Sequence, residues 1–146
     1  MRALALSVEG SIAGVSRAFT TLYREALEAG APVGAPPLTV YPDSPESFNP
    51  AKVRFSVCLP LKGELPELPQ ALSVMELPAV TAAVIVHEGP YEKIGPAYES
   101  LLAWCAREGW KVMSPVREVY VVGPDPSGRR LSAEYRTEVQ FPVERG

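Results

Sequence analysis

Apolar and polar residues alternate along several short stretches of the chain, which is the period of a β-strand with two unlike faces. The alternation predicts strands at 2–9, 38–41 and 53–59 in the first half, and at 79–87, 116–122 and 133–143 in the second, with a brief edge strand at 72–77. Two stretches, 15–26 and 94–105, instead carry apolar residues three and four apart, which predicts amphipathic helices. Gly30 and Gly109 follow these stretches and are expected to end the helices. The order strand, helix, strand, strand therefore occurs twice.

The two halves also share sequence landmarks at one fixed offset. Pairs of matching residues lie 79 positions apart without a gap: Glu9 and Glu88, Ala18 and Ala97, Leu22 and Leu101, Gly30 and Gly109, Pro36 and Pro115, Tyr41 and Tyr120. In the last strand of each half the separation is 82, as for Val57 and Val139, because the preceding hairpin loops differ in length. We interpret this as an internal duplication. The predicted fold is α+β, a tandem pair of strand–helix–strand–strand modules at 1–61 and 79–146, joined by a connector at 62–78.

This architecture predicts a groove. One helix covers one face of each three-stranded unit, and two units side by side make a continuous antiparallel sheet whose other face is bare. By alternation along the last strand, Thr137 and Val139 face the helices, whereas Glu138 faces the opposite side. We therefore expect a ligand groove on the face opposite the helices, with Glu138 as its central acid and Tyr41 and Tyr120 as its walls. Two alternatives stay open: Glu138 is a solvated strand residue, and the tyrosines are ordinary packing residues.

Composition narrows the class of protein. The 146 residues are 47% hydrophobic and 21% charged, as in a soluble globular domain, and the net charge of -3 argues against direct binding to nucleic acid. No apolar run is long enough to span a membrane, and the N-terminus does not resemble a signal peptide, so we expect a cytoplasmic protein. Cys58 and Cys105 are expected to be buried free thiols. His87 is the only histidine and has no partner at ligand spacing, so no metal and no cofactor are expected.

Several segments of the second half resemble a known family. They are His87-Glu88-Gly89-Pro90-Tyr91, Leu101-Leu102-Ala103-Trp104, Val119-Tyr120-Val121-Val122 and the last strand from Tyr135 to Val143. The chain is similar to the GyrI-like effector-binding family, which includes the C-terminal ligand-binding domains of multidrug-responsive MerR-type and AraC-type regulators. The resemblance implies a cleft between paired modules that takes planar, often cationic, drug-like molecules. It assigns the family's charge-neutralising glutamate to Glu138 and its wall tyrosine to Tyr120, with Tyr91, Trp104 and Trp110 as further candidates.

The expected function is that of a stand-alone small-molecule-binding protein for aromatic, cationic or amphipathic ligands. No helix-turn-helix precedes the domain, so a DNA-reading function is not expected in this chain. The alternative from the same resemblance is a hydrolase of strained, cyclopropane-type electrophiles, in which Glu138 guides water or donates a proton and Tyr120 or Trp104 positions the substrate. A third possibility is a module whose exposed sheet face docks another protein. Trp104 is also compatible with the edge of the core. Whether a regulator or gyrase is a partner stays open.

Overall fold

The computed structural model describes residues 1–124 and 127–146 of the chain. Eight strands and two α-helices make up its regular structure: β1 (Arg2–Gly10), α1 (Val15–Glu28), β2 (Leu38–Tyr41), β3 (Val53–Pro60), β4 (Ser73–Glu76), β5 (Ala82–Glu88), α2 (Gly95–Glu108), β6 (Trp110–Val112), β7 (Val116–Val122) and β8 (Arg136–Arg145). The predicted helices, and the strands including the edge strand β4, are present. The three-residue strand β6 was not predicted, because so short an element has no detectable period.

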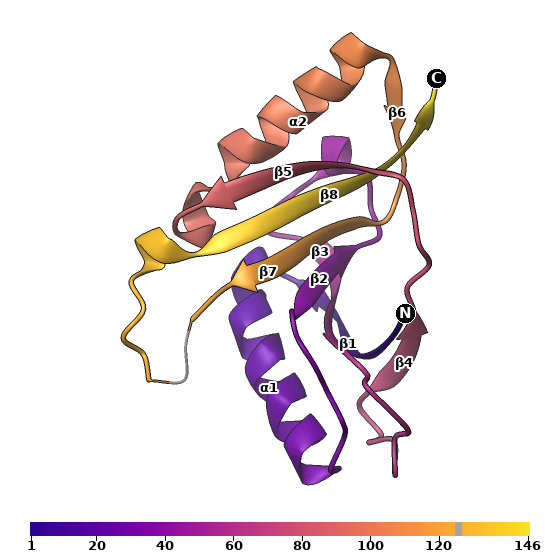
Figure 1. Cartoon of the computed structure of the whole chain (residues 1–146), viewed down its shortest axis with the longest axis vertical. Helices are drawn as coiled ribbons and strands as arrows, with labels where there is room; N and C mark the ends of the chain where they lie inside the picture. Colours follow the sequence, from indigo (N-terminus) through magenta and orange to yellow (C-terminus); the bar gives the residue numbers. More distant parts are fainter. Residues whose placement is uncertain (125–126) are drawn as a thin grey trace.

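The strands form one antiparallel sheet in the order β4-β1-β3-β2-β7-β8-β5, and β6 pairs with β8 (Figure 1). β1, α1, β2 and β3 are the strand–helix–strand–strand unit of the first module, and β5, α2, β7 and β8 are that of the second. The modules meet at the β2–β7 pair in the middle of the sheet. The predicted α+β fold with a duplicated module is confirmed.

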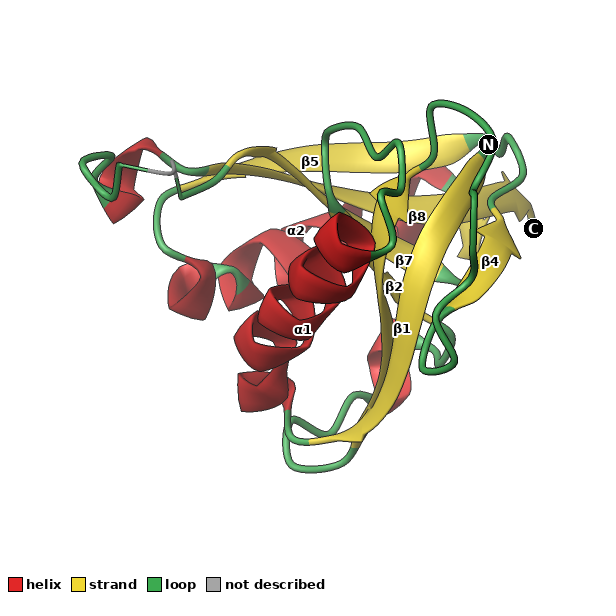
Figure 2. Ribbon diagram, turned by 90° about the horizontal axis from the view of Figure 1, so that it is seen from below, coloured by secondary structure: helices red, strands yellow, loops and turns green. Residues whose placement is uncertain are grey.

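Both helices lie on the same face of the sheet (Figure 2). Each buries a narrow stripe of small and medium side chains against the strands: Ala18, Leu22 and Ala26 in α1, and Ala97, Leu101 and Cys105 in α2. These positions are 79 residues apart, so the duplication preserves the packing surface of the helix. Gly109 ends α2 with φ of 76°, a left-handed conformation that glycine adopts at little cost.

The face opposite the helices is partly covered by the connector. A second, smaller apolar cluster lies there, and it contains Ala5, Val40, Cys58 and Leu77. Arg117, which is 9% exposed, donates a hydrogen bond of 2.7 Å to the carbonyl of Pro78. The connector is thus attached to the centre of the face that was expected to stay bare.

Candidate functional site

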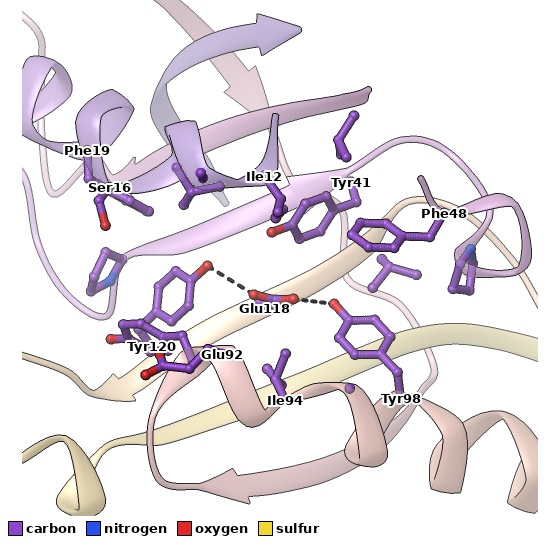
Figure 3. A pocket seen from close by; sticks show the side chains of 18 of the residues that line it. Ile12, Ser16, Phe19, Tyr41, Phe48, Glu92, Ile94, Tyr98, Glu118 and Tyr120 are labelled. Atoms are coloured by element: carbon purple, nitrogen blue, oxygen red, sulfur yellow. Dashed lines mark hydrogen bonds between the residues drawn. The ribbon is translucent and has the colours of Figure 1, made fainter. Parts of the chain in front are cut away.

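A cavity of about 1390 Å³ lies on the helix face of the sheet, with residues of α1, α2, β2 and β7 in its walls (Figure 3). Its volume is larger than the roughly 300–1000 Å³ of a typical small-molecule pocket. Aromatic side chains supply much of its lining: Phe19, Tyr23, Tyr41, Phe48, Tyr91, Tyr98 and Tyr120. The expectation of a groove on the opposite face is therefore corrected, because the cavity opens between the two helices and not behind the sheet.

Strand register explains why the cavity lies on this face. Directly opposed residues of neighbouring antiparallel strands point to the same face of a sheet. Tyr120 pairs with Thr137, and Glu118 pairs with Val139 on one side and Thr39 on the other. Thr137 and Val139 face the helices, as predicted, so Tyr120 and Glu118 face them too.

Glu118 is the acid at the centre of the cavity. Its side chain is 9% exposed, and it accepts hydrogen bonds from the Tyr98 hydroxyl at Oε2 and from the Tyr120 hydroxyl at Oε1, the second at 3.1 Å. The Tyr120 oxygen also lies 2.7 Å from the hydroxyl oxygen of Thr39 (Figure 3 shows the two bonds to the carboxylate). Within residues 1–124 and 127–146, no lysine or arginine forms an ion pair with Glu118.

The protonation of this cluster follows from burial. Burial raises the pKa of Glu118, whereas hydrogen bonds from Tyr98 and Tyr120 and the nearby His87 act in the opposite direction. Burial and the neighbouring Glu118 raise the pKa values of Tyr41, Tyr98 and Tyr120 far above the ordinary value of 10.0. The phenols therefore stay protonated at neutral pH. Within the described residues, the cavity presents a buried carboxyl group that forms no ion pair and accepts hydrogen bonds from neutral phenols.

Three predicted residues lie in the cavity wall. Tyr41 and Tyr120 enter from β2 and β7, and Tyr91 enters from the turn before α2. Tyr91 contacts the Tyr120 ring edge-on, with centroids 5.4 Å apart, and burial raises its pKa to about 12. Tyr41 and Tyr120 line the cavity from the two modules, on the helix side of the sheet and not on the opposite face where the sequence predicted them.

The other three predicted residues lie elsewhere. Glu138 pairs with Val119 and Val86 on the opposite face of the sheet, and its Oε1 accepts a hydrogen bond of 2.9 Å from Gln140. Trp104 is on α2 and 39% exposed, and it does not line the cavity. Trp110 lies in β6 under the Arg145 guanidinium, whose carbon is 3.8 Å from the ring centroid. The structure does not bring these residues to the aromatic cavity. Alternation turns Glu138 to the opposite face of the sheet, Trp104 lies outside the buried stripe of α2, and Trp110 stacks with Arg145.

Sequence reasoning missed Glu118, Tyr98 and Phe48. Glu118 precedes Tyr120 by two residues on one strand, so it had to share the face of that tyrosine. Tyr98 falls within the amphipathic stretch 94–105, where its hydroxyl gives no separate signal. Phe48 lies in the polar loop between β2 and β3, and loop side chains have no period from which to place them.

Comparison with known proteins identifies the family. Residues 1–144 match the family described as GyrI-like small molecule binding domain. The chain belongs to this family. It is a GyrI-like small-molecule binding domain, as its sequence resemblance predicted. No curated protein matches the chain.

Solved structures share the GyrI-like fold. The C-terminal domain of EcmrR superimposes with a TM-score of 0.83 and 24% sequence identity, covering 99% of this chain and 93% of that domain. EcmrR in its complex with DNA gives the same score and identity, but this chain spans only 55% of that longer one. A hydrolase from Listeria innocua gives a TM-score of 0.64 at 14% identity, with 99% of this chain and 87% of that chain covered. At these identities the likeness establishes the fold.

The described part of this GyrI-like chain has no cluster of three or more histidine, cysteine, aspartate or glutamate residues that could hold a metal ion. None of its helices is long and apolar enough to cross a membrane.

Proposed function

We propose that the cavity binds aromatic, cationic or amphipathic small molecules, and that Glu118 supplies the negative charge that pairs with the ligand. The observation that carries this proposal is the buried Glu118 carboxyl group, which forms no ion pair in the described chain. Removing an ionised carboxylate from water is unfavourable unless a positive charge compensates for it. A bound cation is such a compensating charge.

The surrounding rings favour the same ligand class. A cation near an aromatic ring gains about 0.5–2 kcal/mol, depending on how far it is desolvated. A unit charge about 4 Å from the carboxylate gains a further ~4 kcal/mol at an effective dielectric of about 20. Tyr98 and Tyr120 hold the carboxylate in place, so little reorganisation is needed on binding. The net charge of -3 provides no sequence-independent attraction to nucleic acid, which supports a small molecule as the ligand.

The test compares two ligands of the same shape. Phenyltrimethylammonium and tert-butylbenzene differ by one atom at the branched centre, nitrogen in the first and carbon in the second, and so differ in charge. Calorimetric titration of the wild-type protein should give tighter binding of the cation. Glu118→Gln should abolish this preference, and Glu138→Gln should keep it because it removes a carboxylate from the opposite face.

Equal affinity of the wild type for both ligands would refute the role of a charge in the cavity. If the preference for the cation persists in Glu118→Gln and disappears in Glu138→Gln, the carboxylate that pairs with the ligand is Glu138, the residue that the family resemblance selected.

A second candidate function is hydrolysis of a strained electrophile in the same cavity. Its support is the position of Glu118, a buried carboxyl group that Tyr98 and Tyr120 hold at the centre of the cavity. Burial raises the pKa of Glu118, which favours the protonated form that a general acid requires. Water would add across a strained carbon–carbon bond of an activated cyclopropane, with the hydroxyl on one carbon and the proton on the other. Mass spectrometry should then detect the hydrated product with the wild type, and Glu118→Gln should bind the substrate without converting it. Binding without any product in the wild type leaves ligand binding as the function.

A further inference from the structure

The pseudo-two-fold axis that relates the modules passes beside Glu118. Thr39 and Glu118 are equivalent positions, 79 residues apart, and they are also direct partners across the β2–β7 pair. Residues that are both equivalent and opposed lie at the symmetry axis. Tyr41 and Tyr120 are likewise equivalent, each two residues further along its strand. Because β2 and β7 are antiparallel, these tyrosines lie on opposite sides of the axis.

Aromatic side chains gather on both sides of this axis. We define the first half-site as Phe19, Tyr23, Tyr91 and Tyr120, and the second half-site as Tyr41, Phe48 and Tyr98. In Figure 3, Phe19 and Tyr120 lie on one side of Glu118, and Tyr41, Phe48 and Tyr98 lie on the other.

The two half-sites have the same construction. In the first, Phe19 of α1 contacts Tyr120 of β7 edge-on, with ring centroids 5.7 Å apart. Tyr98 of α2, the equivalent of Phe19, occupies the second half-site with Tyr41 of β2. Each half-site therefore combines the helix of one module with a strand of the other.

Each half-site also holds one oxygen of the carboxylate. Tyr120 of the first donates to Oε1 of Glu118, and Tyr98 of the second donates to Oε2. The buried Glu118 thus lies between two aromatic compartments, in a cavity of about 1390 Å³. A ligand with one charge and one ring would fill only one compartment.

We propose that the cavity is built for a ligand with one central cation and two flat apolar arms, one arm in each half-site. This inference rests on the proposed function, because it places the cation at Glu118. The central charge meets the carboxylate at the axis, and each arm leaves it in one of the two pseudo-symmetric directions.

The experiment compares dibenzyldimethylammonium, which has two arms, with benzyltrimethylammonium, which has one arm and the same charge. Calorimetric titrations use the wild type and two matched variants, Tyr23→Ala in the first half-site and Phe48→Ala in the second. Both side chains are about half exposed, 48% and 53%, so their removal leaves the core in place. Burying the second arm should make the two-armed cation about tenfold or more tighter in the wild type.

The variants give the pattern that identifies two half-sites. Each single variant should weaken the two-armed cation by about threefold or more, because either arm loses a contact. The one-armed cation should weaken at most about twofold in each single variant and more in the double variant, because it has a second compartment available.

The inference is overturned if the second arm adds no affinity, or if only one of the two variants weakens the two-armed cation. If neither cation binds, or if binding of the one-armed cation is the same in Glu118→Gln, the proposed function fails and this inference fails with it. Binding of the one-armed cation that depends on Glu118, without a gain from the second arm, overturns the inference alone.

Discussion

The Glu118→Gln variant should be more stable than the wild type at neutral and alkaline pH, although it removes the acid of the cavity. Burial raises the pKa of Glu118 from its ordinary value of 4.5. The folded protein therefore binds this proton more tightly than the unfolded chain does. The resulting stabilisation is complete below about pH 4.5 and is lost as the pH rises through the raised pKa of the folded state. Glutamine cannot ionise, so the variant does not lose this stabilisation as the pH rises.

The size of the effect follows from the gap between the two pKa values. Within that gap the wild type loses about 1.4 kcal/mol of its free energy of unfolding for each pH unit. For a chain of this length, 1 kcal/mol corresponds to a change of roughly 4 °C in the melting temperature, so the loss is about 6 °C per pH unit. Glu118 is 9% exposed, so solvent screens the effect little, whereas the hydrogen bonds from Tyr98 and Tyr120 and the nearby His87 make the gap between the two pKa values smaller.

Melting curves of the wild type and the variant between pH 4 and pH 9 measure this difference. Their melting temperatures should be close at pH 4, and the melting temperature of the variant should exceed that of the wild type by an increasing amount as the pH rises. Glu138→Gln is the matched control, because it leaves Glu118 in place and should retain the loss that Glu118 causes. A difference between Glu118→Gln and the wild type that is constant with pH, or that favours the wild type at high pH, would refute the assignment of a raised pKa.

Further predictions concern the cavity and the core. Affinity for phenyltrimethylammonium should increase with pH until Glu118 is ionised and then level off, which titrations across pH detect; a constant affinity would exclude Glu118 as the counter-charge. Tyr120→Phe removes the hydroxyl that joins Thr39 to Glu118, and urea unfolding should show a loss of about 1–2 kcal/mol, whereas an unchanged midpoint would mean that the bond contributes nothing. Phe141→Ala empties a site with 0% exposure and should cost about 3–5 kcal/mol, against less than about 0.5 kcal/mol for the half-exposed Phe48→Ala. The Cys58 thiol, with 0% exposure and a pKa that burial raises to about 12, should react with a disulfide reagent only after unfolding.

The duplicated fold could be predicted because its signals are local. Gly30 and Gly109 end the helices, and matched apolar stripes recur at an offset of 79. Alternation also showed correctly that Thr137 and Val139 share the helix face. These signals depend on residues close together in the sequence, and tertiary contacts did not override them.

The position of the acid depended on contacts that alternation does not contain. Alternation shows which residues share a face within one strand. The register between β7 and β8 decides which residues of β7 lie on the same face of the sheet as a given residue of β8. The pairing of Tyr120 with Thr137 sets that register, and it places Glu118 in the cavity and Glu138 behind the sheet. The connector, attached through Arg117 to Pro78, then covers part of the face that the sequence left bare.

The duplication also explains why one buried acid, and not two, lies at the centre of the cavity. At a pseudo-two-fold axis, a residue faces its own counterpart, and opposed residues of an antiparallel pair have Cα atoms about 4.5–5.5 Å apart. A strictly repeated glutamate would place two carboxyl groups there, and like charges at such a distance cannot both be ionised in a buried site. Thr39, in the place of a second acid, avoids the repulsion, and its hydroxyl pairs with that of Tyr120, which donates to Glu118. The modules had to differ at this position for the pseudo-symmetric cavity to hold a single buried negative charge at its axis.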